Sequence, residues 1–245
     1  MLPEICSLGP LTLHSYGLAI ALGVFLAVFF MTRAAGRFGF PPVEKVFDLV
    51  FVVVFFGFLG ARILYILQEW RWYQGHPLEI FQIWKGGLVY YGGMMASFLA
   101  LFICLRRNRL PFLATTDFAI SYVPLVHAFG RIGCFLNGCC FGKASTLPWA
   151  VLFPGFVTRL HPVQLYEAVF NLALFGFLAR HYARRNFPGE VISLYLIFYS
   201  AGRFFLEFFR GDQTKIFLSL SLPQVMSFIF AGAGILLYGI CRSRR

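Results

Sequence analysis

The sequence has little charge for its length. Only 13% of its 245 residues are charged and only 10 are acidic, whereas 59% are hydrophobic and the mean hydropathy is +0.75. Soluble domains of ordinary composition have about a quarter of their residues charged. The composition therefore excludes a soluble globule and predicts an integral membrane protein.

Signals of several other protein classes are also missing. The six cysteines do not form the two separated Cys-x-x-Cys pairs of a zinc site, so we expect no metal and interpret most of them as small packing residues; an oxidised pairing of Cys139 or Cys140 stays open. No basic segment precedes the first apolar run, and we expect no signal peptide. The net charge of +11 lies in short clusters between apolar runs. That pattern favours cytoplasmic loops and anionic lipid headgroups over nucleic acid.

What the sequence does have is a series of long apolar runs. Each is near the roughly 20 residues that cross a bilayer as a helix. We therefore expect an all-α, polytopic fold in which residues 1–245 form a single integral membrane domain. The expected spans are about 13–32, 46–67, 88–105, 117–136, 163–181, 190–209 and 219–240.

Basic residues follow every second run. Because cytoplasmic loops are enriched in Lys and Arg, these clusters predict an external N-terminus and a cytoplasmic C-terminus, as an odd number of spans requires. The clusters are Arg33, Arg37 and Lys45; Arg106, Arg107 and Arg109; Arg180, Arg184 and Arg185; and Arg242, Arg244 and Arg245.

The most informative segment is HAFGRIGCFLNGCCFG, residues 127–142. Its four glycines, Gly130, Gly133, Gly138 and Gly142, allow close backbone approach or a departure from helical geometry. A membrane tolerates such a departure only where the polar groups line a buried or wet cavity. Arg131 lies among these glycines and stays protonated, so it predicts a carboxylate, backbone carbonyls or a phosphate as its partner.

Other embedded charges point in the same direction. Tyr199, Arg203, Glu207 and Arg210 are spaced by four, four and three residues and therefore share one helix face. An ion pair that locks helix packing explains part of this pattern. The arginines nevertheless outnumber the acids, which favours an anionic ligand such as a phospholipid headgroup or a phosphorylated lipid. The embedded residues counted are Arg62, Arg131, Arg203 and Arg210 against Asp117, Glu167 and Glu207.

Two further motifs allow a structural and a functional interpretation. HPVQLYE, residues 161–167, opens the fifth run with Pro162, and its Gln164 and Glu167 side chains suit the N-terminus of a helix. His161 in the same motif is a candidate proton carrier. GGLVYYGG, residues 86–93, places two glycine pairs around Tyr90 and Tyr91. It predicts close approach to another helix or to a ligand.

Taken together, these segments resemble the bacterial prolipoprotein diacylglyceryl transferases over nearly the whole chain. Residues 130–142 are similar to the family signature, and residues 161–167 and 199–210 match the next two blocks in order. Tyr16-Gly17 and residues 86–93 also have counterparts in the family.

The resemblance implies transfer of the diacylglyceryl group of phosphatidylglycerol to the thiol of the lipobox cysteine of a preprolipoprotein, with release of glycerol phosphate. The implied partners are phosphatidylglycerol, the preprolipoprotein signal peptide and membrane lipids, without nucleic acid. The implied location is the bacterial cytoplasmic (inner) membrane, with the active site toward the outer leaflet. The reaction needs no metal and no organic cofactor, because protein donors can stabilise the leaving phosphate and no redox step occurs.

The resemblance also implies roles for particular residues. Arg131 and Arg203 would stabilise the departing phosphate, and Asn137 and Tyr199 would orient the headgroup. Tyr91 stands where some members have a histidine proposed as the base, so we expect it to act by hydrogen bonding and leave the base open, with His161 as a substitute. Cys134 stands where some members have a second asparagine. The other residues expected to contact phosphatidylglycerol are Gly142, Glu207 and Tyr16.

Two alternatives use the same residues differently. A transporter or flippase for an anionic phospholipid would bind the headgroup with the same arginines without reacting, but the sequence has no visible inverted repeat or pair of broken helices. A membrane scaffold would explain the apolar runs but not the embedded arginines.

Overall fold

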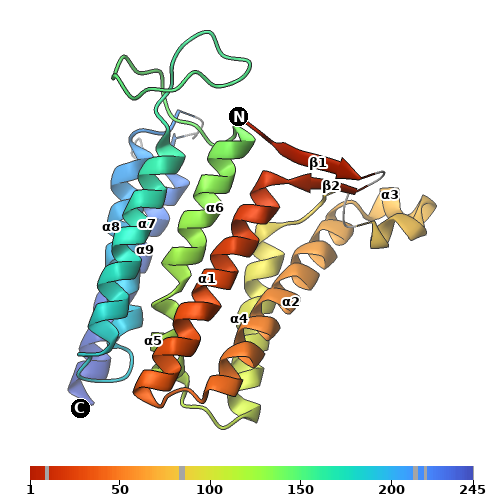
Figure 1. Cartoon of the computed structure of the whole chain (residues 1–245). Coiled ribbons are helices and arrows are strands. Elements are labelled where there is room, and N and C mark those ends of the chain that lie inside the picture. The colour runs from red at the N-terminus through yellow and green to blue at the C-terminus, as the bar shows by residue number, and fades with distance from the viewer. Residues whose placement is uncertain (9–10, 83–85, 212–214, 218–219, 245) are drawn as a thin grey trace. The chain divides into compact units, whose positions relative to one another are not determined.

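The computed structural model describes residues 1–8, 11–82, 86–211, 215–217 and 220–244. Arg245 of the last basic cluster lies outside them. The chain forms two compact units, one of Met1–Met31 with Leu113–Arg245 and one of Thr32–Phe112. Each unit is helical (Figure 1).

The first unit contains most of the helices. Its longest members are α1 (Ser15–Phe38, in this unit to Met31), α6 (Val123–Asn137), α7 (Val163–Tyr182), α8 (Glu190–Glu207) and α9 (Leu222–Ser243). Helix α7 packs against both α6 and α8, and α8 packs against α9, as Figure 1 shows. The expected helices at 163–181, 190–209 and 219–240 are confirmed to within about three residues, the ordinary uncertainty of helix ends.

The second unit is built on two helices, α2 (Val43–Gln68) and α4 (Tyr90–Arg107), with the short α3 (Trp70–Gly75) and the 3₁₀ helix η1 (Pro77–Phe81) between them. Gly57 and Gly60 of α2 face Gly92 and Gly93 of α4. A Cβ atom on Gly60 would lie 2.6 Å from the carbonyl oxygen of Gly92, so only glycine permits this approach. The helix-packing interpretation of the glycines at 92 and 93 is therefore confirmed.

The expected span at 117–136 is interrupted. It consists of α5 (Phe112–Ile120) and α6, separated by a turn at Ser121 and Tyr122. Pro124 explains the break, because its ring has no N–H to donate to the carbonyl of Ile120 and clashes with that carbonyl in a continuous helix. Proline is well tolerated in the first turn of a new helix, which is where Pro124 lies.

Two small hairpins add strands to the expected all-α fold. Strand β1 (Glu4–Leu8) pairs antiparallel with β2 (Leu11–His14), and β3 (Lys215–Phe217) pairs with β4 (Leu220–Ser221). The first helix consequently begins at Ser15 rather than near residue 13, and it runs to Phe38. Alternating apolar and polar residues from Leu11 to His14 are a strand signal that the long apolar run conceals.

The helices place apolar side chains outward. On α1 the buried positions include Ser15, Ala19, Gly23 and Ala27, whereas Phe25 is 65% exposed. Small residues thus face the helix neighbours and large apolar ones face outward, the arrangement expected against lipid. Four helical segments are long and apolar enough to cross a bilayer: Ser15–Phe38, Val43–Gln68, Phe112–Asn137 and Leu222–Ser243.

Candidate functional site

Three arginines converge on one carboxylate inside the first unit. Glu167 of α7 forms an ion pair with Arg131 of α6 through Oε2. Its Oε1 lies 3.0 Å from Nη1 of Arg203 on α8 and 3.8 Å from Nη1 of Arg210, which follows α8. Glu167 therefore joins residues that are far apart in the sequence and belong to three helical segments.

Arg203 bridges two acids. Its Nη2 lies 2.8 Å from Oε2 of Glu207, one turn further along α8, while Nη1 contacts Glu167. The Ser221 hydroxyl at the start of α9 donates to Oε1 of Glu207 at 2.8 Å. A planar guanidinium suits this bridging geometry, because its donors point in fixed directions.

We call the five charged residues Arg131, Arg203, Arg210, Glu167 and Glu207 the arginine cluster. Together they carry one net positive charge. Arg131, Arg203 and Arg210 supply three positive charges, and Glu167 and Glu207 supply two negative ones. The side chains of Arg131 and Arg203 are 19% and 16% exposed, whereas Arg210 is 6% exposed. A cationic surplus in an apolar environment favours an anion, and Arg131 and Arg203 are the members with surface left to meet it.

An aromatic group lies beside the cluster. Nε of Arg131 donates to Nε2 of His127 at 3.3 Å, one turn earlier on α6, so this ring nitrogen acts as an acceptor. The His127 ring contacts Tyr199 at 5.5 Å between centroids, and Tyr199 stacks on Tyr195 at 5.3 Å. The predicted residue Tyr199 is thereby placed next to the cluster.

Glycine is required at two positions of the signature segment, for a different structural reason at each. A Cβ atom on Gly133 would lie 3.1 Å from Cα of Tyr16, so this position lets α6 approach the start of α1. Gly138 ends α6 in the left-handed conformation, with φ of 75°. Such a C-terminal glycine reverses the chain directly after the helix. Gly130 meets only Ile20, at ordinary van der Waals distance.

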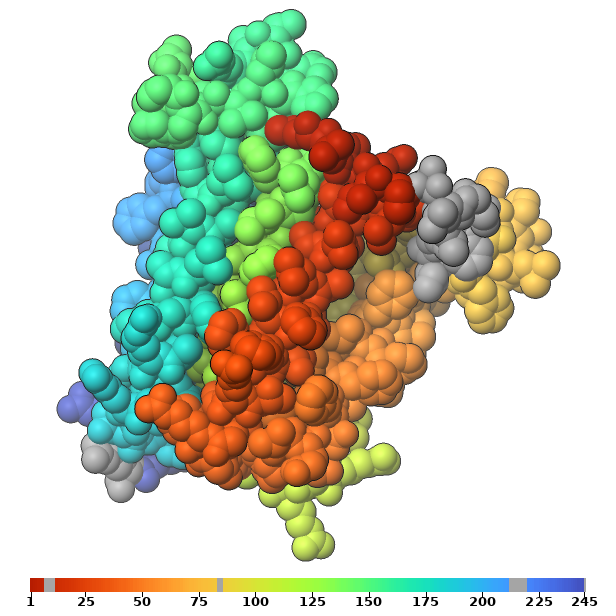
Figure 2. Space-filling view, in the orientation of Figure 1, coloured from red at the N-terminus to blue at the C-terminus, as the bar shows by residue number. Residues whose placement is uncertain are grey.

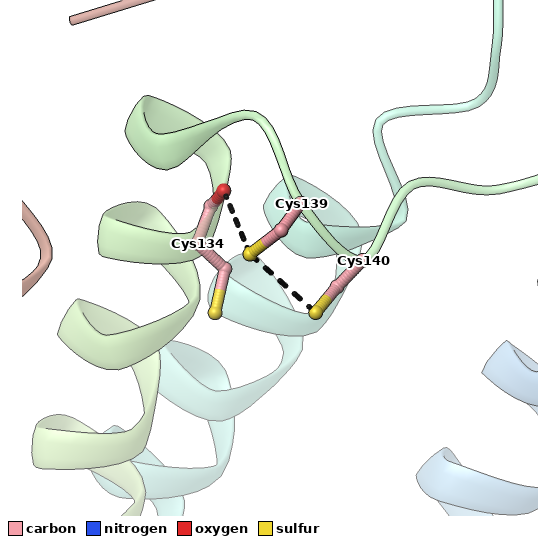
Figure 3. A group of neighbouring side chains, drawn as sticks. All are labelled: Cys134, Cys139 and Cys140. Carbon is pink, nitrogen blue, oxygen red and sulfur yellow. Dashed lines mark hydrogen bonds between the residues drawn. The ribbon is translucent and has the colours of Figure 1, made fainter. Parts of the chain in front are cut away.

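The reversal at Gly138 brings three thiols together. Cys134 lies in the last turn of α6, and Cys139 and Cys140 follow Gly138 (Figure 3). The sulfurs of Cys139 and Cys140 are 3.6 Å apart. A hydrogen bond with the Cys134 thiol holds the pKa of Cys140 below its usual range, and Arg131 and Arg210 act in the same direction.

The segment 138–162 is tied to the helices by backbone contacts. Gly142 donates to the carbonyl of His161 at 2.9 Å, and a Cβ atom on Gly142 would lie 2.8 Å from Cβ of His161. Lys143 donates from its backbone to the carbonyl of Phe209. Figure 2 shows this segment, in green to teal, at the end of the unit where α7 begins. The requirement for glycine at position 142 thus comes from the protein's own packing.

His161 lies within this network. Its Nδ1 is 3.2 Å from the hydroxyl of Tyr166, which also accepts from Nε1 of Trp149 at 2.7 Å. The His161 ring packs on Phe209 at 5.3 Å between centroids. The half-buried histidine therefore has a hydrogen-bonding partner on α7 and a packing partner after α8.

The remaining predicted residues lie at element ends. Tyr16 is the second residue of α1 and is 43% exposed. Asn137 is the last residue of α6, where it is exposed and interacts with the Cys139 thiol. Tyr91 belongs to the second unit, near the start of α4, and is 61% exposed.

Two embedded charges counted in the sequence have structural partners elsewhere. Arg62, in the second unit, donates to the carbonyls of Glu79, Ile80, Gly86 and Gly87 at 2.7–3.1 Å. Asp117 accepts from the backbone N–H groups of Gly189 and Ile192, at the start of α8. Neither residue belongs to the arginine cluster.

Three members of the site were absent from the predicted site residues: Glu167, Arg210 and His127. The sequence counts Glu167 among the embedded acids and as a residue suited to a helix N-terminus, and the structure makes it the acid that all three arginines contact. The spacing of four between His127 and Arg131 places both on one face of α6 and was the available signal. No spacing in the sequence links Glu167 to Arg131 or Arg203.

The apolar helices indicate a membrane protein, and the arginine cluster places a surplus of positive charge inside it. Phospholipid enzymes and transporters both fit this description. Comparison with known proteins decides between them. The family model of prolipoprotein diacylglyceryl transferase matches residues 3–240, and the chain belongs to this family. It is therefore a transferase of the membrane.

Curated relatives agree over almost their whole lengths. The chain is 34% identical over 235 residues to phosphatidylglycerol–prolipoprotein diacylglyceryl transferase 2 of Clostridium perfringens, covering 94% of this chain and 91% of the relative. It is 33% identical to the corresponding enzyme of Clostridium tetani, covering 100% of both chains. It is 35% identical to that of Symbiobacterium thermophilum, covering 96% of this chain and 91% of the relative.

Proposed function

We propose that this transferase moves the diacylglyceryl group of phosphatidylglycerol to the thiol of the lipobox cysteine in a preprolipoprotein signal peptide. The observation that carries the proposal is the arginine cluster, with one net positive charge and two partly exposed guanidinium groups. The family and the names of its relatives support the choice of substrates.

The chemistry is a displacement at a glycerol carbon. The thiolate sulfur forms a carbon–sulfur bond while the bond from that carbon to the phosphate oxygen breaks, and its electron pair leaves with glycerol phosphate. The phosphodiester carries one negative charge and the departing monoester carries up to two. Donors that hold the phosphate more strongly as this charge grows lower the barrier.

Arg131 and Arg203 are the proposed donors. Both are fixed by Glu167, and both keep part of their side chain exposed, so they can grip a phosphate without first being ordered. Glu207 holds the second arm of Arg203, which makes it a positioning residue. Tyr199 and Asn137 are proposed to orient the headgroup, Gly142 to keep its segment against the helices, and Tyr16 to contact the lipid at the start of α1.

The thiol proton needs an acceptor, because an ordinary cysteine with a pKa of about 8.5 is mostly protonated at neutral pH. We propose His161 as a substitute for the missing base, because an imidazole nitrogen can accept a proton and because His161 pairs with the segment of Gly142, which lies against Arg210. Tyr91 is proposed to act by hydrogen bonding, because a phenol with a pKa of about 10 is a poor base at pH 7.

For the membrane arrangement we propose seven spans, with an external N-terminus and a cytoplasmic C-terminus. The proposal adds α4, α7 and α8 to the four apolar segments. Helices of 18 to 20 residues are about 27–30 Å long, close to the thickness of the hydrocarbon core. The location is the bacterial cytoplasmic membrane, with the site toward the outer leaflet and residues 1–245 acting as one domain.

An in vitro assay tests the proposed reaction. Purified protein in detergent is mixed with phosphatidylglycerol and a lipobox peptide, and the thioether product and glycerol phosphate are measured by mass spectrometry. A peptide with serine in place of the lipobox cysteine is the control. Folded protein that forms no thioether would contradict the proposal, and lipid scrambling in vesicles without thioether would favour the transporter instead.

A further inference from the structure

The three thiols at the end of α6 form a group that the transfer reaction does not use. The side chains of Cys134, Cys139 and Cys140 lie next to one another in Figure 3. Their sulfur atoms all lie within 4.8 Å of one another. All three cysteines are unpaired thiols.

The backbone holds this group in place. Gly138 and Cys140 both have positive φ, of 75° and 64°, so the chain turns sharply back onto the last turn of α6. The buried side chain of Gln164 on α7 donates to the carbonyl of Cys139 at 2.6 Å. The thiols are therefore gathered by a turn that a second helix fixes, rather than by the cysteines alone.

The spacing fits one metal ion. Three sulfurs that each lie about 2.3 Å from a central ion are about 4 Å apart when the ion is in their plane. Small side-chain rotations that move the sulfur atoms by less than about 1 Å bring the observed separations to this value. Thiolates are soft ligands and select ions such as Cu(I) or Zn²⁺ over Mg²⁺ or Ca²⁺.

The ligand number separates these two ions. In the described part of the chain, no His, Asp, Glu or fourth Cys joins the group. Structural Zn²⁺ sites are almost always four-coordinate, whereas three sulfurs leave that shell incomplete. Three thiolates with one Cu(I) carry two negative charges, and Arg131 and Arg210 interact electrostatically with Cys140. The neighbouring guanidinium groups thus favour the anionic complex.

We propose that Cys134, Cys139 and Cys140 form a binding site for one thiophilic metal ion, with Cu(I) as the ion that the three-sulfur set favours. Binding forms three copper–sulfur bonds and releases the three thiol protons to solvent, without a redox step. The proposal does not depend on the transfer reaction.

A competition titration tests the site. Tag-free protein in detergent, fully reduced by thiol count, is titrated anaerobically with Cu(I) against a chromogenic Cu(I) chelator. We expect one tightly bound equivalent, with three sulfur neighbours by X-ray absorption. Cys139→Ser and Cys140→Ser should each lower the affinity at least 100-fold, more than the 10–100-fold expected for an outer-shell partner.

Cys6→Ser, at an exposed cysteine in strand β1, is the matched control and should bind as the unaltered protein does. Thermal unfolding of each variant shows whether it is folded. Copper binding that persists in the folded Cys139→Ser and Cys140→Ser variants, or no binding to the reduced protein, would overturn the proposal. A parallel Zn²⁺ titration that gives a tighter complex than Cu(I) would overturn the choice of ion.

Discussion

The two units hold buried arginines in opposite ways. In the second unit, Arg62 is surrounded by four backbone carbonyls and has no carboxylate partner among the described residues. In the first unit, Arg131, Arg203 and Arg210 share Glu167, and Arg203 also holds Glu207. Both arrangements keep a charge inside an apolar protein, but they leave different capacities for further contacts.

The two sites differ in how much of each guanidinium group stays accessible to a further partner. Arg62 donates to two carbonyls of η1 and to those of Gly86 and Gly87, and it is only 6% exposed, so it functions as a clamp between η1 and these glycines. Arg131 and Arg203 are fixed on one side by acids and remain partly exposed on the other. A buried arginine is thus a stronger candidate for catalysis when its partners immobilise it without covering it.

Removing a cluster arginine should have the largest effect on activity. We expect Arg131→Ala to lower kcat for thioether formation about 100- to 1,000-fold, the usual loss of a donor that stabilises transition-state charge. The assay with phosphatidylglycerol and a lipobox peptide measures it. Arg107→Ala, at an exposed arginine near the end of α4, is the matched control and should stay within twofold. Full activity in Arg131→Ala would contradict the proposal that Arg131, unlike Arg62, takes part in the reaction.

Replacing the clamp should mainly affect stability. Arg62→Met leaves four carbonyls without their donor, and we expect a loss of about 3 kcal/mol in the free energy of unfolding. Thermal unfolding in detergent measures it, with Arg71→Met on the exposed face of α3 as the control. The activity per folded molecule should fall far less than in Arg131→Ala. A variant as stable as the unaltered protein would refute the clamp.

A change that keeps the charge tests the bridging geometry. Lysine cannot reach Glu167 and Glu207 with two fixed donors as Arg203 does, so we expect Arg203→Lys to lower kcat/KM about tenfold. Arg203→Ala should lose much more. Steady-state kinetics with varied phosphatidylglycerol distinguish the two variants. Equal rates for Arg203→Lys and the unaltered enzyme would mean that charge alone suffices.

The smallest effect concerns an acid outside the cluster. Asp117 accepts two backbone N–H groups at the start of α8, and an asparagine can accept only one of them well. We expect Asp117→Asn to cost about 1 kcal/mol of stability, as the loss of a helix cap does. Chemical denaturation in detergent measures it against Asp48→Asn, which alters an exposed pair with Lys45. A loss of activity without a loss of stability would place Asp117 in the site.

Much of the fold follows from local sequence. The apolar runs predicted the positions of α2, α4, α7, α8 and α9, because hydrophobic length is a strong local signal. The break before Pro124 and the strand β2 were missed within otherwise apolar runs, although proline and alternation are local signals too. A signal of a few residues is weak beside the hydrophobicity of the roughly 20 residues that surround it.

The candidate site was predictable only in part. Arg131 and Arg203 stand out in the sequence because charge is rare within apolar runs. Glu167 stands out for the same reason, but its pairing with both arginines does not, since it is 36 residues from each of them. The roles of Arg62 and Asp117 were equally hidden, because their partners are backbone groups that no side-chain pattern reveals. Long-range pairing is set by the packing of helices, and that packing has no local signature.

The position of Glu167 has a consequence for biogenesis. A helical membrane protein first inserts its helices and then assembles them side by side. Glu167 meets Arg131 and Arg203 only when α6, α7 and α8 have assembled, so an inserted but unassembled chain lacks the arginine cluster. If the cluster binds the phosphate as proposed, catalytic competence is coupled to completed assembly, and freshly inserted chains do not act on the surrounding lipid.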